Sequence, residues 1–266
     1  TRSLCDWSSD VCSSDLFLAY QLYAPFLANY ERVIIFSEIQ KDLLMKLGVP
    51  GKRVAVIPNG VDVDKYSPGA SSLKTQLNAS RIFLYLGRIS TAKNVESLLK
   101  AWKHSDMDSG SCLSIVGDGP LAPSLQMFYS DVKGVSWFGY ISDEQRRIEI
   151  LRGADVFILP SLVEGLSLAL LEAMSCGLAC IATDAGADGE VLEKGAGIIL
   201  NTHNVTSQLQ TLFPVFRDHP EFNTLLGQKA RQRVLERYTL SRNITQLEML
   251  YDEVLQERNL KLGSLI

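Results

Sequence analysis

The chain has 266 residues, of which 46% are hydrophobic and 21% charged, and its formal net charge is −4. This composition is that of a globular protein, and the mild acidity excludes a global positive field that would recruit nucleic acid. The length allows one large domain or a domain and a half, and no apolar run reaches the ~20 residues of a membrane-spanning helix.

The first sixteen residues differ from the rest of the chain. The stretch DWSSDVCSSDL (Asp6–Leu16) is polar and rich in Ser, and read back into codons it matches the adapter of a common short-read sequencing chemistry at all eleven positions. We therefore expect residues 1–16 to be translated adapter, disordered and joined to a gene fragment, and exclude them from the fold. The alternative is a natural disordered terminus. On the adapter interpretation, the genuine chain begins upstream of Phe17.

The segment that follows is short but has the pattern of a folded domain. Residues 17–30 are apolar with polar interruptions. Strands are predicted at Arg32–Phe36 and Arg53–Ile57, with a helix between them at Glu38–Leu47 that Gly48 and Pro50 close. Turn residues with few apolar anchors come next, in PNGVDVDKYSPGASS. We therefore predict an interdomain linker at residues 59–80.

Beyond the linker, apolar runs of strand length alternate with amphipathic stretches. Strands are predicted at Ile82–Leu86, Leu113–Val116, Val135–Phe138, Val156–Leu159, Leu178–Ala182 and Gly197–Leu200. Helices are predicted after Pro120 and at Val95–Lys103, Ser142–Arg152, Leu166–Ser175, Val205–Phe216, Glu221–Tyr238 and Ser241–Glu257. Such alternation with short connections predicts an α/β fold, a parallel sheet with helices on both faces.

Ligands of open parallel sheets bind outside the carboxyl ends of the strands, so the loops that follow strands are candidate sites. The loop Leu86–Asn94 (LGRISTAKN) carries Arg88 and Lys93. A guanidinium fork and an ammonium on one loop suit a diphosphate, although solvated surface charge gives the same pattern. The loop VGDGP (Val116–Pro120) has two Gly that would let backbone approach a ligand before a helix begins, or form only a tight turn.

The most informative stretch is PSLVEGLSLALLEAMSCGLACIATDAG, Pro160–Gly186. Glu164 follows a strand, and Glu172 lies two helical turns later as the one charge among Leu, Ala and Met residues. Such a carboxylate is costly unless a partner satisfies it. Either it lies on a narrow solvated stripe of the helix, or it accepts hydrogen bonds from ligand hydroxyls. The residues Gly165-Leu166-Ser167 open the predicted helix, and their amides and the helix dipole predict an anion site.

Metal binding is not predicted. Asp106-Met107-Asp108 has the D-x-D spacing of a metal motif, but it lies in a polar loop after a helix rather than at the end of a strand. Outside the first sixteen residues the Cys residues are Cys112, Cys176 and Cys180, an odd and sparse set that suits a reducing compartment. Cys176 and Cys180 lie among apolar residues, which predicts buried small side chains.

These motifs together resemble GT-B glycosyltransferases, in particular the large retaining family often numbered four. Glu164 and Glu172 resemble its E-x7-E signature, and further segments follow in the family's order and spacing over about Arg32–Leu255. They are VIPNGVD (Val56–Asp62), the Leu86–Asn94 loop, VGDGP, WFGYIS (Trp137–Ser142), ADVFILPS (Ala154–Ser161), GADGEVL (Gly186–Leu192) and RYTLSRNITQLEMLY (Arg237–Tyr251). The sequence departs from the family's pattern where Leu166 replaces an aromatic residue and Ser167 a Gly.

The resemblance implies a domain arrangement. Residues 81–240 would form a Rossmann-like parallel sheet with helices on both faces, the C-terminal, donor-binding half of a GT-B fold. Residues 17–58 would be a fragment of the N-terminal Rossmann-like domain, which binds the acceptor. The last helix, residues 241–266, would return toward that N-terminal domain.

The resemblance also implies roles for individual residues. Arg88 and Lys93 would clamp the donor diphosphate and stabilise charge on the leaving nucleotide, and Glu164 would hold a hydroxyl of the donor sugar. These three are the predicted catalytic residues. The predicted donor-binding residues are Gly87, Gly117, Ile141, Gly165, Leu166, Ser167 and Glu172, with Glu172 on the ribose hydroxyls and the backbone near Ile141 reading the base.

The implied partner is a nucleotide-diphosphate-sugar, whose sugar is transferred with retention and without metal or other cofactor. The acceptor (lipid, polysaccharide or small molecule) stays open. A cytoplasmic location is expected, and peripheral membrane contact through the missing part of the N-terminal domain stays open. We expect this truncated chain to bind donor weakly and to transfer no sugar. Alternatives are a non-catalytic GT-B-like binding domain, or another GT-B enzyme such as a sugar-nucleotide epimerase or a phosphorylase.

Overall fold

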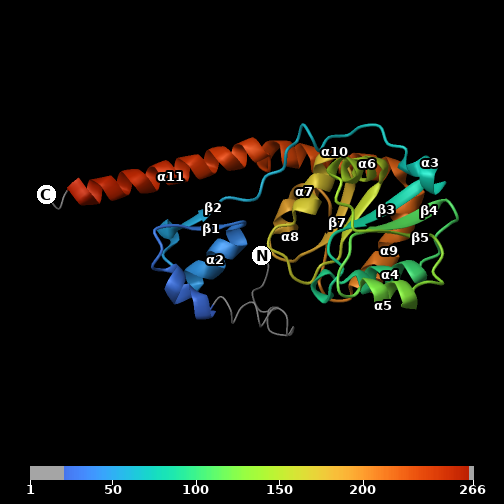
Figure 1. The fold of residues 1–266 in the computed structure, drawn as a ribbon. Helices are drawn as coiled ribbons and strands as arrows, with labels where there is room; N and C mark the ends of the chain where they lie inside the picture. Colours follow the sequence, from blue (N-terminus) through green and yellow to red (C-terminus); the bar gives the residue numbers. More distant parts are fainter. Residues whose placement is uncertain (1–20, 264–266) are drawn as a thin grey trace. The chain divides into compact units, whose positions relative to one another are not determined.

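The computed structural model describes residues 21–263, with side chains to residue 260, and these form two units. One unit contains residues 21–60 and 240–263, and the other is Val61–Thr239 (Figure 1). The predicted adapter segment, residues 1–16, lies outside the described residues. Among those described, no helix combines the length and apolar character that crossing a bilayer requires.

The smaller unit contains a strand–helix–strand motif. Its strands β1 (Val33–Ile35) and β2 (Val54–Val56) pair in parallel, and α2 (Glu38–Lys46) connects them through η2 (Gly51–Arg53). The helix begins where the Ser37 side chain accepts a hydrogen bond from the amide of Gln40. The unit also contains a helix at residues 21–27 and the long α11 (Leu240–Gly263). A small core fills it, made of Ala24, Ile35, Leu44, Val49 and Val54.

The predicted linker, residues 59–80, is largely part of the larger unit. Only its first two residues lie outside that unit, which begins at Val61. The segment contains a short helix, α3 (Leu73–Leu77). Its apolar side chains are sparse, but Val61, Tyr66 and Leu73 are all buried. A few well-buried anchors therefore fix a stretch whose composition resembles a flexible connection.

The larger unit is built on a six-stranded parallel sheet in the order β5-β4-β3-β6-β7-β8. The strands are β3 (Arg81–Leu86), β4 (Ser111–Val116), β5 (Val135–Gly139), β6 (Val156–Leu159), β7 (Ala179–Thr183) and β8 (Ile198–Leu200). The central strands are buried on both faces, which explains their continuous apolar runs. The predicted parallel α/β architecture is confirmed.

Helices cover both faces of this sheet. On one side lie α4 (Val95–Lys103), α5 (Ala122–Phe128) and α9 (Val205–Asp218), and on the other α6 (Glu144–Gly153), α7 (Leu168–Ser175) and α10 (Pro220–Arg237) (Figure 1). Short turns η3 (Thr91–Lys93), α8 (Asp188–Val191) and η4 (Glu193–Gly195) complete the unit. The rings of Phe83, Trp102 and Phe213 lie edge-to-face with centroids 5.3 to 5.4 Å apart and join β3 to α4 and α9.

Two helices begin two residues later than predicted. Asp143 caps α6 by accepting a hydrogen bond from the amide of Gln145 at 2.9 Å, so that helix begins at Glu144 and not at Ser142. Ser167 caps α7 in the same way through the amide of Leu170. The helix therefore begins at Leu168, and Leu166 lies in the loop before it.

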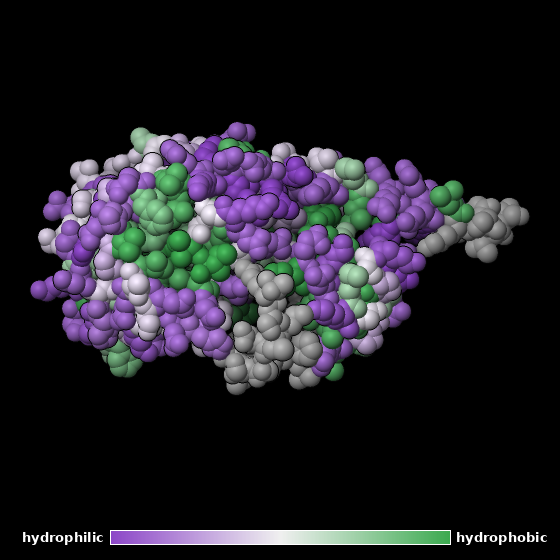
Figure 2. All heavy atoms as spheres, turned by 180° about the vertical axis from the view of Figure 1, so that it is seen from behind, coloured by the Kyte–Doolittle hydropathy of each residue, from purple (hydrophilic) through white to green (hydrophobic). Residues whose placement is uncertain are grey.

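The strand order reverses direction between β3 and β6. The loops that follow these two strands meet there, because the amide of Leu162 donates a hydrogen bond to the carbonyl of Ala92 at 2.8 Å. In open parallel sheets this reversal is where ligands bind. Hydrophilic residues cover most of the rear of the molecule, with apolar side chains gathered over part of it (Figure 2).

Candidate active site

Lys93 and Glu164 form an ion pair between the loops that follow β3 and β6. Glu164 also accepts a hydrogen bond from the Ser161 hydroxyl at 2.9 Å. The Glu164 side chain is 9% exposed, whereas that of Lys93 is 25% exposed. The Glu164 carboxylate is therefore largely buried and held in place, whereas the Lys93 ammonium is accessible to solvent. Since an ammonium has three donors, Lys93 can bind Glu164 and an anion together.

Arg88 lies on the same loop as Lys93 and is exposed. The backbone carbonyl of Arg88 accepts a hydrogen bond from the buried hydroxyl of Tyr85 at 2.7 Å, which fixes the turn that begins at Gly87. Burial, and secondarily the charge of Glu164, raise the pKa of this Tyr85 hydroxyl. It therefore remains a neutral donor that holds the backbone of the predicted diphosphate loop.

The glycines of VGDGP approach the chain's own backbone. A Cβ on Gly117, where φ is +138°, would lie 1.9 Å from the carbonyl oxygen of Gly87. A Cβ on Gly119 would lie 2.3 Å from the carbonyl oxygen of Ile89. The sequence predicted close approach to a ligand at Gly117, whereas the structure shows close approach between two loops. These glycines let the loop after β4 pack against the loop that carries Arg88.

The Glu164 loop is held by the segment that follows β7. Gly186 has φ +60°, and a Cβ there would lie 2.1 Å from the carbonyl oxygen of Glu164. The amide of Ala187 donates to the carbonyl of Gly165 at 2.8 Å, and the amide of Ser167 donates to Asp188 Oδ1 at 2.9 Å. The predicted anion-binding amide of Ser167 thus has a carboxylate partner within the protein.

Asp188 is itself an unusual group. It is 1% exposed, and burial raises the pKa of its carboxyl to about 7. The Ser167 amide and Lys93 act in the opposite direction, whereas Glu164 raises the pKa further. The site therefore contains a buried acid that titrates near neutral pH.

Glu172 lies in the second turn of α7 and is half-buried. It therefore does not lie on an open solvated stripe. Burial raises the pKa of Glu172, and the Tyr66 hydroxyl and Arg147 lower it. The Tyr66 hydroxyl also donates to Glu144 Oε1 at 3.1 Å, so one buried tyrosine joins two carboxylates. Glu144 is paired in turn with Lys65 at 2.5 Å.

Ile141 lies in the loop between β5 and α6. Its carbonyl accepts a hydrogen bond from Arg147 Nη1 at 3.1 Å, and the carbonyl of Ser142 accepts from the same nitrogen at 3.0 Å. Arg147 therefore orders the backbone that the sequence predicts to read the base, and it also faces Glu172.

The D-x-D motif lies elsewhere. Asp108 accepts a hydrogen bond from the Ser111 hydroxyl at 2.5 Å, and the Asp106 carbonyl accepts from Arg217. The pKa of Arg217 is raised mainly by its bond to Asp218 and further by Asp108 and Asp106. Within residues 21–263 no three His, Cys, Asp or Glu side chains are arranged as metal ligands would be.

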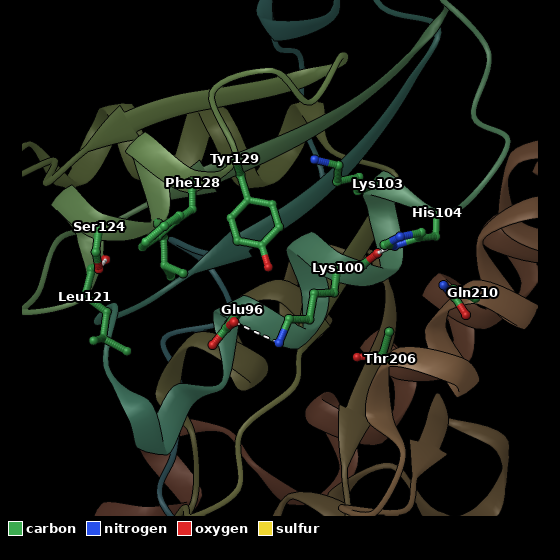
Figure 3. A pocket seen from close by; sticks show the side chains of 11 residues that line it. Glu96, Lys100, Lys103, His104, Leu121, Ser124, Phe128, Tyr129, Thr206 and Gln210 are labelled. Carbon is green, nitrogen blue, oxygen red and sulfur yellow. Dashed lines mark hydrogen bonds and ion pairs between the residues drawn. The ribbon is translucent and has the colours of Figure 1, made fainter.

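A separate open pocket of about 750 Å³ lies between α4, α5 and α9 (Figure 3). Glu96 and Lys100 pair across one helical turn at its base, and Phe128 and Tyr129 form part of its wall. None of the predicted donor-site residues lines it. This pocket is therefore not the predicted site.

Comparison with known proteins identifies the family. Residues 80–213 match the family model described as glycosyl transferases group 1, and residues 13–65 match the model described as glycosyltransferase family 4. The chain belongs to the group 1 glycosyltransferase family. The chain is 29% identical over 250 residues to a UDP-Gal:alpha-D-GlcNAc-diphosphoundecaprenol alpha-1,3-galactosyltransferase of Escherichia coli, a match that covers 88% of the chain and 63% of the relative.

Solved structures show the same fold. Sucrose-phosphate synthase from Thermosynechococcus elongatus superposes with a TM-score of 0.77 at 23% identity, covering 97% of this chain and 65% of that one. HepE from Anabaena, solved with UDP-glucose, gives a TM-score of 0.76 at 19% identity, covering 91% and 70%. The fold is therefore that of GT-B glycosyltransferases. The chain spans 63%, 56% and 40% of the lengths of three curated relatives that it matches.

Three residues of the site are not among the residues predicted for it from the sequence, although Asp188 lies in the segment GADGEVL. Tyr66 lies in the predicted linker, and Asp188 and Arg147 are charged residues of ordinary-looking turns and helices. Their role follows only from contacts with residues far along the chain, Tyr66 with Glu144 and Asp188 with Ser167. Periodicity and spacing do not encode such pairings.

Proposed function

We propose that this chain is the donor-binding part of a retaining glycosyltransferase that uses a nucleotide-diphosphate-sugar and needs no metal ion. The observation that carries the proposal is the Lys93–Glu164 ion pair at the reversal of the sheet, with Arg88 on the same loop. Cations beside a carboxylate, at the carboxyl ends of parallel strands, suit a ligand with both phosphates and hydroxyls.

In this proposal the two cations act on the leaving group. Lys93 keeps one donor on Glu164 and directs the others to phosphate oxygens, while the exposed Arg88 presents its guanidinium fork. Both charges stabilise the negative charge that develops on the departing nucleoside diphosphate. Glu164, fixed by Lys93 and Ser161, accepts from a hydroxyl of the sugar.

Glu172 and Ile141 bind the nucleoside in the same proposal. Glu172 accepts from the ribose hydroxyls, with the Tyr66 hydroxyl and Arg147 favouring its charged form. The backbone at Ile141, ordered by Arg147, lies against the base. The donor nucleotide is best tested first with UDP, because the name of the Escherichia coli relative includes UDP-Gal and HepE was solved with UDP-glucose.

Calorimetric titration of the chain with UDP, GDP and ADP, and with their sugars, tests the proposal. We expect the chain to bind the nucleotides of one base only. Glu172→Ala should weaken that binding by about 10- to 100-fold, the effect of losing hydrogen bonds to a charged group. Glu96→Ala is the matched control, since Glu96 pairs only across the surface of α4 in the separate pocket. Equal binding by both variants, or no binding of any nucleotide to folded protein, would refute the proposal.

Sugar transfer needs more residues than the donor site provides, and it is proposed for the whole protein. We expect this chain to bind nucleotide without transferring sugar at a rate like that of a full-length relative. Product analysis with labelled donor distinguishes transfer from isomerisation and phosphorolysis, and the anomeric configuration of any product tests retention. Unchanged nucleotide affinity after chelator treatment tests the metal-free part of the proposal.

A further inference from the structure

Asp188, on the short α8, is a buried carboxyl group with one oxygen unsatisfied. Its Oδ1 accepts the amide hydrogen of Ser167 at 2.9 Å. Its Oδ2 has no hydrogen-bond partner among the described residues. An ionised carboxylate in such surroundings loses its hydration and regains one hydrogen bond, which favours the neutral acid. A proton on Oδ2 would remove the charge and leave the bond to Ser167 intact.

The position of Asp188 connects it to the donor site. Ser167, whose amide it holds, caps the N-terminus of α7, and the adjacent amide of Ala187 holds the carbonyl of Gly165. Asp188 therefore fixes the segment that begins at Glu164. The proposed diphosphate lies beside Lys93, the partner of Glu164. Negative charge brought there acts directly on the Asp188 carboxyl.

The charged groups around Asp188 come from several elements. Glu164, after β6, raises the pKa of Asp188, and Lys93, after β3, lowers it. Asp184, at the end of β7, lies against Gly189, the residue next to Asp188. On α8 itself Glu190 follows two residues later, and its carbonyl accepts from Arg233 of α10. Lys93 is thus the cation that acts on Asp188 from the donor loops.

We propose that Asp188 is a positioning residue of the donor site that takes up a proton when the donor diphosphate binds, so that a neutral carboxylic acid holds the Ser167 amide in the complex. This inference rests on the proposed function, because it needs an anion beside Lys93. The proton comes from solvent and no covalent bond changes. The role differs from that of Arg88 and Lys93, since Asp188 acts through the backbone of the Glu164 loop.

The direction of the coupling follows from the charges. Burial already raises the pKa of Asp188 to about 7. A bound diphosphate adds negative charge and takes a share of Lys93, and both changes raise this pKa further. Above pH 7 binding must then bring a proton with it, and by linkage affinity must fall as pH rises. The terminal phosphate, with a second pKa near ~6, is already ionised in that range.

The test is calorimetric titration with UDP between pH 7 and 9 in two buffers of different ionisation enthalpy, which gives the number of protons taken up. For the unmodified chain we expect roughly 0.5 to 1 proton per UDP near pH 8, and an affinity that falls about 3- to 10-fold per pH unit. Asp188→Asn, which retains the acceptor for Ser167, should bind without proton uptake and with little pH dependence.

Asp118→Asn is the matched control, because Asp118 also accepts from a backbone amide, that of Gly119 at 2.7 Å, but is exposed. It should keep the proton uptake of the unmodified chain.

Binding without proton uptake, or equal uptake by Asp188→Asn, overturns this inference and leaves the donor site standing. If UDP does not bind but GDP or ADP does, the same experiment is run with that nucleotide. If none binds, the proposed function is overturned and this inference with it. Should Asp188→Asn fail to fold, the two-buffer measurement on the unmodified chain decides.

Discussion

The phenol of Tyr66 interacts with two carboxylates, those of Glu144 and Glu172. Its hydroxyl donates to Glu144 and lowers the pKa of Glu172. Tyr66→Phe keeps the buried ring and removes only the hydroxyl, which leaves both carboxylates less well satisfied. We expect nucleotide affinity to fall about 3- to 10-fold, the effect of one hydrogen bond to a charged group. Calorimetric titration of the variant measures this loss.

The control for Tyr66→Phe is Tyr140→Phe. Tyr140 lies just before Ile141 but is 75% exposed, and no described carboxylate depends on its hydroxyl. The control should bind nucleotide as the unmodified chain does. If Tyr66→Phe also leaves affinity unchanged, the hydroxyl does not position Glu172.

The burial of Asp188 also predicts that the free energy of unfolding depends on pH in the absence of any ligand. Its pKa in the folded protein, about 7, is above the ordinary value of 3.8. The folded state therefore binds this proton more tightly than the unfolded chain, and the associated stability is present below pH ~4 and lost as pH rises to ~7. Asp188→Asn should raise the free energy of unfolding at pH 8 by about 2 to 4 kcal/mol relative to the unmodified chain.

Urea unfolding at pH 5 and pH 8 measures this effect. The advantage of Asp188→Asn should shrink at pH 5, where the native aspartic acid is already neutral. Asp118→Asn, on an exposed loop, should show the same pH dependence as the unmodified chain. An Asp188→Asn variant that is no more stable at pH 8 than at pH 5, relative to the unmodified chain, would show that burial does not neutralise this group.

Some features of the candidate site follow from the local sequence, and others depend on contacts between residues far apart in the chain. Arg88, Lys93 and Glu164 were predicted as site residues because they follow strands of a parallel sheet, and Glu172 because it is a charge in an otherwise apolar helix. The direct Lys93–Glu164 pair was not predictable, since it joins loops 71 residues apart. Gly117 was assigned to the ligand, yet its missing Cβ makes room for Gly87. A glycine pattern indicates close approach without identifying what approaches.

At the scale of elements, Gly186 determines where the Glu164 loop can lie. A Cβ at this position would lie 2.1 Å from the carbonyl oxygen of Glu164, in a backbone conformation with φ +60°. Gly186→Ala should therefore displace the loop, lower the melting temperature and weaken nucleotide binding by tenfold or more. Thermal melting and calorimetric titration measure the two effects.

Gly195→Ala is the control that distinguishes the effect of the steric clash from the effect of backbone strain. Gly195 has a similar φ, +80°, but a Cβ there would meet only the end of the flexible Lys229 side chain, at 3.6 Å. This control should lose the roughly 1 kcal/mol of a residue forced into the left-handed region and keep its nucleotide affinity. Equal loss of affinity in both variants would mean that the loop does not depend on Gly186.

The order and type of the elements were predictable, and their first residues were less so. Buried parallel strands are apolar throughout, as in β4 and β6, so apolar runs identify them. The starts of α6 and α7 depend on which of several polar residues accepts the first amide. Asp143 and Ser167 do so, and each lies one residue inside the predicted helix, because the sequence pattern does not show which side chain accepts that hydrogen bond.

At the scale of the whole molecule, residues 61–80 have the composition of a linker but pack as part of the larger unit. Its Gly, Pro and Ser residues predicted a linker. Its buried side chains Val61, Tyr66 and Leu73 attach it to the larger unit, and the hydroxyl of Ser71 donates to the carbonyl of Glu149 on α6 at 2.7 Å. Composition averages over the segment, whereas attachment depends on three apolar positions.

The larger unit should therefore fold by itself as residues 61–239. It contains the complete parallel sheet and its helices, and its two ends are joined by a hydrogen bond from the amide of Val61 to the carbonyl of Tyr238 at 2.8 Å. All the proposed donor-site residues lie within it. We expect cooperative unfolding and nucleotide affinity within about threefold of the full chain, since cuts at the boundary between two compact units remove few contacts within either unit. Residues 81–239, cut at the end of the predicted linker, should instead melt at a lower temperature and bind more weakly, because Tyr66 and the fully buried Leu73 are lost.

Circular dichroism melts and calorimetric titration compare the two fragments. If the shorter fragment is as stable and binds as well as the longer one, residues 61–80 are a linker after all, and the position of Tyr66 beside Glu172 has no part in donor binding.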